Sequence, residues 1–503
     1  MKTKIILSLV LLISMLLSLS SCFFEGEVST TTATTTTTTA ATTTTTASDT
    51  ENNGDPEYVL GDMPVIKVNC KNNAPVVSKE EYVDCTVSAS HCSDEYRFSN
   101  VSAGIRCRGN SSLPKDPINN QAPYRIKFDK KQSILGLNDS AECKSWVLLK
   151  PDMGNAIAFH LGQSLFVEEG YYCSDYQFVE LYLNGQYRGV YVLCEQSQIN
   201  ENRVDVYETP EGFDSYKTGY FLEIDNYGYQ EPEDHKFETN FGDRPLTDLE
   251  GNKLSSELVS VGDNINARWY VLKNDYVSSE QLEFIQKYIE NVFAVAYRAI
   301  IQERYFELNS NFNLTYSKSS NPKEVIGKYI DLDSLVNMYL IQEISMNSDV
   351  GAGSFFMSVD FSEEAESNKL TFECPWDFNW AFRDTSRDVG KNYEGLSAAT
   401  FCPDSFVYQN SSKKDRSNPW LILFMNAEWF RDMVRERWTE LKEAGVFEES
   451  LEQMDMWIEN YEPEFTAHFE KWRDNVYAKA VSNRKWLANR YTWLEDKLFS
   501  MDN

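Results

Sequence analysis

The sequence predicts an α+β protein, with an antiparallel, strand-rich N-terminal part and a helix-rich C-terminal part. Between residues 65 and 225, short runs of β-branched and aromatic residues alternate with turn residues, as half-buried strands do. From residue 278 onward, apolar residues recur at helical spacing instead. Strands gathered ahead of helices, rather than alternating with them, are typical of the α+β class.

The chain begins with the layout of a secretory signal, because Met1-Lys2-Thr3-Lys4 precedes an apolar run from Ile5 to Leu19. This run is too short to be a lasting membrane span. The segment Leu19-Ser20-Ser21-Cys22 resembles a bacterial lipobox, whose cysteine becomes the lipidated first residue of the mature chain. We therefore expect a lipoprotein signal peptide over residues 1–22, lipidation at Cys22, and an extracytoplasmic protein that contacts the cell membrane through its lipid anchor only. An ordinary cleaved signal with a chance cysteine is the alternative.

A low-complexity segment follows the signal. Nearly every residue from Ser29 to Ser48 is Thr or Ala, and no apolar periodicity is present, so residues 23–58 are expected to form a disordered linker. About 440 residues then remain to fold, which is enough for one large or two medium domains.

The composition restricts the partners. A formal net charge of −30 argues against a nucleic acid partner, since phosphate binding needs clustered Lys and Arg. Nine cysteines follow Cys22, with no Cys-x-x-Cys pair and no Cys/His cluster, so a zinc site is not expected. Whether these cysteines form disulfides or remain free thiols stays open.

The strand-rich part is predicted from four β-type runs at residues 65–69, 81–87, 101–108 and 124–128, which should form an antiparallel layer. Apolar residues between Ala156 and Leu165 then have helical spacing. Asn184-Gly185 between two β-rich runs predicts a hairpin, because both turn residues must accept positive φ.

A further strand is predicted at residues 219–225, before the helical part. Helices are predicted from Ser278 to about Glu303 and from Leu332 to Ile344, the second with Asp331 or Asp333 as its N-cap. Aromatic-rich helices are expected from Trp420 to the C-terminus, with most of their tryptophans in the core.

Two acidic segments are the main candidates for chemistry. Asp349 follows the predicted helix that ends near Ile344, and Asp377 follows a predicted strand at residues 369–373. Because a hairpin accounts for the residues between them, both carboxylates should return to the same end of the sheet. Such a pair suits phosphoryl transfer, with one Asp orienting a hydroxyl and the other holding Mg²⁺, or glycoside hydrolysis with two carboxylates. Ordinary loop-capping acids are the third reading.

The chain resembles the spore coat protein H (CotH) kinase-like family through a set of motifs that spans roughly residues 60 to 495. In chain order these are Arg106-Cys107-Arg108-Gly109-Asn110-Ser111-Ser112, Tyr124-Arg125-Ile126-Lys127-Phe128, Leu183-Asn184-Gly185 with Gly189-Val190-Tyr191 and Glu195, Gly219-Tyr220-Phe221-Leu222-Glu223, Asn347-Ser348-Asp349, and Trp376-Asp377-Phe378. The resemblance implies an atypical protein-kinase-like fold over residues 100–497, after a β-rich N-terminal region at 59–110.

The resemblance also implies a function and roles for single residues. The expected activity is transfer of the ATP γ-phosphate, with Mg²⁺, to Ser or Thr of a protein outside the cytosol, and the anchor would allow a cell-surface assembly. Asp349 matches the catalytic aspartate and Asp377 the metal-binding aspartate, with Asn347 or Asn379 completing the metal shell. The phosphate-side loop contains Arg108, Asn110 and Ser111. Lys127 is the nearest lysine for the phosphates, and Glu195 or Glu223 could pair with it.

Two departures from the family pattern matter. Asn379 stands where many members have a second Asp, which removes one charge from the metal site. Gln121-Ala122-Pro123 precedes Tyr124, where members often carry Lys, so the identity of the phosphate lysine stays open. A catalytically degenerate surface scaffold and a glycan-active hydrolase that uses Asp349 and Asp377 are the competing readings.

Overall fold

This computed structural model describes residues 61–225, 227–239, 245–249, 251, 253–254, 269–347, 349–351, 353–382, 393–400 and 418–502. The expected signal peptide with Cys22 and the expected linker at 23–58 lie outside these residues and stay predictions. Within the described ranges, no helix combines the length and the apolar character that crossing a membrane requires.

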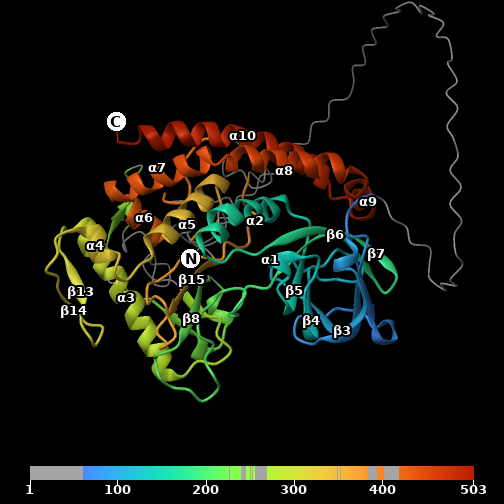
Figure 1. Cartoon of the computed structure of the whole chain (residues 1–503), viewed down its shortest axis with the longest axis horizontal. Helices are drawn as coiled ribbons and strands as arrows, with labels where there is room; N and C mark the ends of the chain where they lie inside the picture. The colour runs from blue at the N-terminus through green and yellow to red at the C-terminus, as the bar shows by residue number, and fades with distance from the viewer. Residues whose placement is uncertain are drawn as a thin grey trace, which may run out of the picture. The chain divides into compact units, whose positions relative to one another are not determined.

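The N-terminal strands, predicted as an antiparallel layer, form a closed barrel (Figure 1). The barrel order is β1-β2-β3-β4-β5-β7-β6, and β1 pairs with β6 in parallel to close it. The bounds are β1 Val65–Cys70, β2 Val83–Ser90, β3 Phe98–Cys107, β4 Tyr124–Gln132, β5 Cys143–Leu149, β6 Tyr176–Leu183 and β7 Gln186–Glu195, with the short helix α1 Leu137–Ser140 before β5. Closure leaves the barrel without a free edge between β1 and β6.

The alternation of side chains along β3 and β4 decides what lies inside the barrel. Ala103, Ile105 and Cys107 of β3 are buried in its core, together with Tyr124, Ile126 and Phe128 of β4. The residues that alternate with them, which include Arg106 of β3 and Arg125 of β4, therefore face outward. Strand β3 crosses the predicted boundary at residues 100–110, so the β-rich N-terminal region is part of the same barrel as the motifs that follow it.

The predicted hairpin is confirmed. Strands β6 and β7 meet at Asn184 and Gly185, whose φ angles are 52° and 73°. Both residues are in the left-handed region, as a two-residue hairpin turn requires.

A second, four-stranded sheet has the order β15-β8-β12-β9, built from β8 Gly219–Ile224, β9 Lys236–Glu238, β12 Trp269–Leu272 and β15 Phe355–Asp360. The strand predicted at residues 369–373 is not formed as a continuous ladder. Thr371 exchanges two backbone hydrogen bonds with Ser358, at 2.8 Å each, whereas neighbouring Leu370 bonds to Tyr329 and Asp331. Because the segment divides its bonds between β15 and a different loop, it makes only isolated bridges. Two small hairpins complete the strands, β10 Leu246–Thr247 with β11 Lys253–Leu254, and β13 Phe306–Leu308 with β14 Leu314–Tyr316.

Helices make up most of the C-terminal part, so the α+β prediction is confirmed. These helices are α3 Ser279–Ile301, α4 Pro322–Ile326, α5 Leu332–Ser345, α6 Pro419–Met425, α7 Glu428–Glu443, α8 Val446–Asn460, α9 Glu462–Trp472 and α10 Val476–Ser500, while α2 Met153–Leu165 lies between β5 and β6. Ser278 caps α3 in a capping box with Gln281, and Asp331 is the N-cap of α5. Both caps satisfy backbone N–H groups that the first helical turn leaves free.

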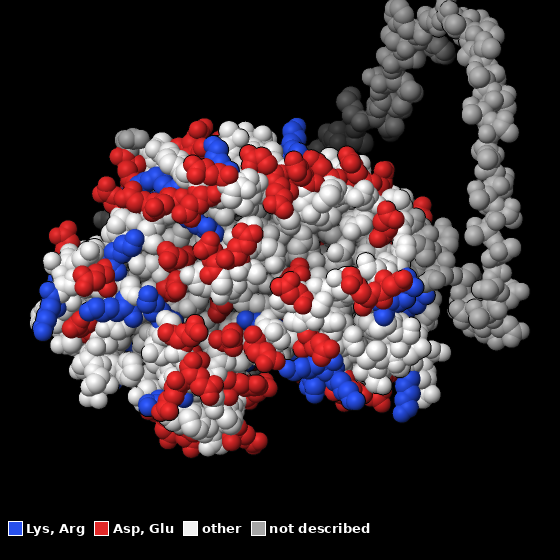
Figure 2. Space-filling view, viewed as in Figure 1, with Lys and Arg blue, Asp and Glu red and all other residues white. Residues whose placement is uncertain are grey.

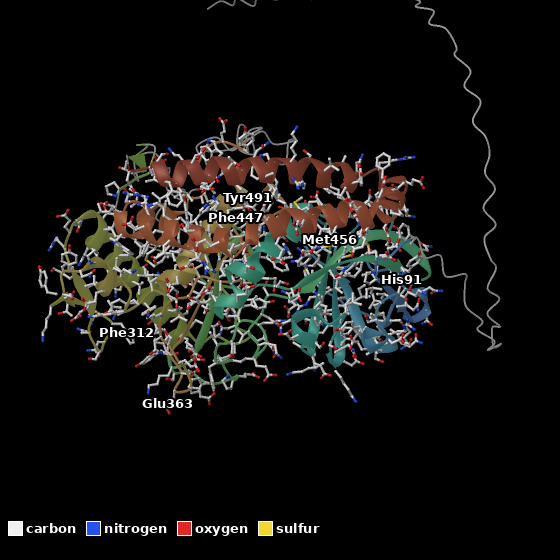
Figure 3. The ribbon with its side chains drawn as sticks, turned by 45° about the horizontal axis from the view of Figure 1, so that its top comes forward. His91, Phe312, Glu363, Phe447, Met456 and Tyr491 are labelled. Atoms are coloured by element: carbon white, nitrogen blue, oxygen red, sulfur yellow. The ribbon has the colours of Figure 1, made fainter. Side chains whose placement is uncertain are left out.

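Most tryptophans of the last helices are core residues, as predicted, whereas Phe469 and Phe499 are exposed. Trp420, Trp438 and Trp486 are buried. Figure 3 shows Phe447 of α8 and Tyr491 of α10 next to each other, and their stacked rings are 4.6 Å apart between centroids. The eight cysteines that the described residues include are free thiols, and all except Cys92 are buried.

Candidate active site

The two predicted acidic loops meet. Burial and then the nearby charge of Asp349 raise the pKa of Asp377 to about 7, and the Arg108 guanidinium works against this rise. The Asp377 side chain is exposed at the surface, so a ligand can reach it, while the protein groups packed around its carboxylate displace part of its hydration. The two segments also touch, because the Phe382 N–H, after Asp377, donates to Ser345 O at the end of the helix ahead of Asp349, at 2.7 Å. The expectation that the two acidic loops lie close together agrees with this contact.

Helix α5 sets the position of Asp349. Met346, the C-cap, has the left-handed angles φ 47° and ψ 48°, which end the helix and turn the chain. Asn347 is buried; its Nδ2 donates to Gln342 Oε1 at 2.9 Å, and its Oδ1 accepts from the backbone N–H of Asp349 at 3.0 Å. Since both ends of this amide hold the turn together, Asn347 positions Asp349 and is poorly placed to be a metal ligand.

The loop of Asp377 is anchored directly after that residue, at Phe378, and again at Phe382. Asn155 in the first turn of α2 accepts a hydrogen bond from the Phe378 N–H at 2.8 Å, and the Phe382 N–H donates to Ser345 O of α5 at 2.7 Å. Asp377 itself has φ 61°, a left-handed conformation that Asp and Asn tolerate better than other residues with a Cβ. The loop is therefore held in one shape between α2 and α5.

Asn379 fits the predicted metal shell. Its Oδ1 is buried and has no hydrogen-bond partner among the described residues. A buried amide oxygen without a donor suits a hard cation, and Mg²⁺ typically takes one or two protein ligands and completes its shell with phosphates and water. No three His, Cys, Asp or Glu side chains of the described ranges converge to hold a metal. Asp377 and Asn379 could thus hold Mg²⁺ only together with ligand oxygens.

The two candidate glutamates have partners other than Lys127, so the expected pairing with that lysine is wrong. Glu195 forms a fully buried ion pair with Arg203 at 3.0 Å. Glu223 forms an ion pair with Lys273 and accepts from the Ser354 N–H at 3.1 Å. Lys127 lies exposed on the outer face of β4. Glu223 still belongs to the site, because its charge contributes to the raised pKa of Asp377.

Of the predicted phosphate-side loop, the described contacts bring only Arg108 to the acidic pair. Its guanidinium lies 5.6 Å from the centre of the Trp376 ring. Burial lowers the pKa of Arg108, and the negative charge of Asp377 opposes this lowering. Asn110 and Ser111 are exposed, and Asn110 Oδ1 accepts from Lys79 Nζ at 2.7 Å.

Sequence reasoning missed two charged residues of the site. Asp152, the N-cap of α2, contributes its negative charge to the raised pKa of Asp377. Its position before a helix was a visible signal, but one that indicates capping rather than chemistry. Lys273 directly follows β12 and pairs with Glu223, and no local pattern marks it.

A buried ion pair supports the Asp349 side of the site. Glu343 of α5 and Arg490 of α10 lie 2.7 Å apart, and both side chains are fully buried. The Glu343 carboxylate also accepts from the N–H groups of Ser397 and Ala398, each at 2.9 Å. This network fixes the last turn of α5, from which the Asp349 loop leaves.

Two comparisons with known proteins bear on the family of this chain. No curated protein matches the chain. A protein-family model described as CotH kinase protein matches residues 105–494. Arg108, Glu223, Asp349 and Asp377 all lie inside the matched range, which covers most of the sequence. The chain therefore belongs to the CotH kinase protein family.

Proposed function

We propose that this protein is an extracytoplasmic, lipid-anchored atypical protein kinase, with a protein-kinase-like fold, that transfers the γ-phosphate of ATP to Ser or Thr of a secreted or surface protein. The observation that carries the proposal is the meeting of Asp349 and Asp377 on separately anchored loops beside Arg108. A base, a metal ligand and a fixed cation are the parts that phosphoryl transfer needs.

Each residue of the site has a separate role in the proposed reaction. Asp349, held by Asn347, accepts the proton of the substrate hydroxyl as that oxygen bonds to the γ-phosphorus. The bond from the γ-phosphorus to the bridging oxygen breaks, and ADP leaves. Arg108 offsets negative charge on the phosphates. Asp377 and Asn379 would hold Mg²⁺, which supplies further charge neutralisation when bound.

The location rests on the chain's first residues. The apolar run and the lipobox-like end at Cys22 support export and anchoring, and the Thr/Ala-rich linker would hold the folded part away from the membrane surface. The acidic composition supports a neutral or basic protein substrate. Figure 2 shows Asp and Glu side chains spread over much of the face that it presents.

A degenerate surface scaffold of the same family is the second candidate. Asn379 in place of a second acid favours it, because the metal site then has one negative charge fewer.

Thermal unfolding with Mg²⁺ and ATP separates the two functions. A ligand at about 100 times its Kd adds about 2.7 kcal/mol to the free energy of unfolding, so the wild-type midpoint should rise. Asp377→Asn should abolish the rise. Asn is preferred to Ala here because it tolerates φ 61° and leaves the backbone unstrained. Asp129→Asn, an exposed acid on β4, is the matched control and should respond as wild type.

Transfer of labelled γ-phosphate to a Ser/Thr protein, lost in Asp349→Asn, would then establish catalysis. If neither the wild type nor the control responds to Mg²⁺ and ATP, the kinase proposal is wrong and the scaffold stands.

A further inference from the structure

Three arginines lie close together on the outer face of the barrel, and one of them, Arg108, reaches the acidic pair. Arg106 of β3 lies directly opposite Arg125 of β4 in the strand register. Arg108 follows two residues after Arg106 and therefore projects from the same side of the chain. Directly opposed residues in an antiparallel pair have Cβ atoms only about 5 Å apart. The three positive charges are thus concentrated in one small area.

Arg106 and Arg125 have no acidic partner among the described residues, whereas Arg108 lies near Asp377 without forming an ion pair with it. None of the ion pairs among the described residues includes Arg106, Arg108 or Arg125, although the chain has 77 acidic residues and only 47 Lys and Arg. By contrast, the fully buried Arg203 and Arg490 are each paired with a glutamate. Two arginines of the row therefore lack a carboxylate, although acidic residues greatly outnumber basic residues in this protein.

Their remaining contacts leave hydrogen-bonding capacity unused. The Nε atoms of Arg106 and Arg125 are buried and have no acceptor in the described ranges. Arg125 donates to Ser145 Oγ at 3.1 Å, while Arg106 lies over the Tyr82 ring at 5.2 Å. Burial, followed by the neighbouring guanidinium charges, lowers the pKa of Arg125. An anion bound to the row would offset both the missing hydrogen bonds and the repulsion.

We propose that Arg106 and Arg125, next to Arg108, bind the polyphosphate chain of the nucleotide, and that Arg125 rather than Lys127 is the phosphate-binding cation of β4. This inference rests on the proposed function. Guanidinium groups match phosphate oxygens in pairs, which a lysine cannot do. Lys127 lies opposite Gly104, so it is two residues, or roughly 7 Å along the strand, farther from Arg108 than Arg125 is. Arg108 connects the row to Asp377, where the metal-bound end of the phosphates would lie.

Binding of inorganic tripolyphosphate to the full chain in EDTA, measured by titration calorimetry, tests the row without metal or catalysis. Arg125→Gln should weaken this binding at least about tenfold, since a charge-assisted hydrogen bond contributes more than 1.4 kcal/mol. Arg125→Lys should be intermediate. Lys130→Gln removes one charge from the exposed end of the same strand and should bind as wild type. Arg106→Gln is a second variant if Arg125→Gln unfolds.

Each result decides the question. If Lys127→Gln loses tripolyphosphate binding and Arg125→Gln keeps it, the assignment to Arg125 is wrong. The assignment is also wrong if binding of a phosphoserine peptide requires Arg125 while binding of tripolyphosphate does not. If tripolyphosphate binding needs Arg125 but the wild type transfers no phosphate, the kinase proposal fails and the anion site stands. If phosphotransfer is intact in both Arg125→Gln and Arg106→Gln, the anion site fails and the kinase proposal stands.

Discussion

Replacing Gly154 by Ala should damage the site although alanine favours helices. Gly154 is in the first turn of α2, and a Cβ there would lie 2.1 Å from the Phe378 carbonyl oxygen and 2.9 Å from Asp152 Oδ1. An ordinary contact of 3.4 Å would require the Asp377 loop to move by more than 1 Å. Alanine gains at most about 1 kcal/mol of helix propensity, whereas overpacking against a fixed backbone costs about 1–3 kcal/mol. Subtracting the full gain from this cost leaves a net loss of about 0–2 kcal/mol of stability.

The effect on the site should exceed the effect on stability. Phe378 adjoins Asp377, and a displacement of about 1 Å in a catalytic constellation can lower a rate about a hundredfold. Urea unfolding measures the first quantity, and Mg²⁺–ATP thermal shift with phosphotransfer measures the second.

Gly170→Ala is the matched control for the Gly154 variant. Gly170 has φ +84° with no atom within 4 Å of the added Cβ, so the change strains the backbone away from the site. It should cost about 1 kcal/mol and leave the ATP response intact. A Gly154→Ala protein that is more stable than wild type and responds normally to Mg²⁺ and ATP would refute the reasoning.

Two further predictions concern buried charges. Burial raises the pKa of Glu180 from an ordinary 4.5 to about 7, and the charge of Glu464 also contributes. Between these two pH values the folded state holds a proton that the unfolded state releases, so the free energy of unfolding should fall as the pH rises. Glu180→Gln should flatten this fall and be up to about 3 kcal/mol more stable at pH 8, measured by urea unfolding; an unchanged pH slope would contradict it. Arg490→Met leaves the buried Glu343 carboxylate uncompensated and should cost about 3–5 kcal/mol, with part regained in Arg490→Met/Glu343→Gln. Strictly additive effects in denaturant unfolding of these variants would show that the pair is not coupled.

The local features of this fold were readable from the sequence because their causes are local. Asn184-Gly185 requires positive φ wherever it occurs, and Ser278 and Asp331 satisfy N–H groups within three residues of themselves. The meeting of Asp349 and Asp377 was also predictable, since the chain between them must turn back. The hairpin and the caps are decided by residues that are neighbours in the sequence, and the acidic pair by a segment of 28 residues.

The features that the sequence did not reveal depend on distant contacts. Barrel closure needs the parallel pairing of Val65 with Glu180, more than a hundred residues away, and no local pattern encodes it. The true partners of Glu195 and Glu223 were equally invisible, because any nearby cation could have satisfied them. Asp152 was missed because a helix cap and a site residue look the same in a sequence.

The anchoring of the Asp377 loop has a consequence for redesign. Both anchors use backbone N–H groups of the loop, at Phe378 and Phe382, so the side chains between these positions contribute nothing to either bond. The loop can therefore accept a new ligand set without a new scaffold, and exchanging Asn379 for an acid would change the chemistry of the metal shell while its framework stays in place. Asn155 has no such freedom, because its side chain makes the bond.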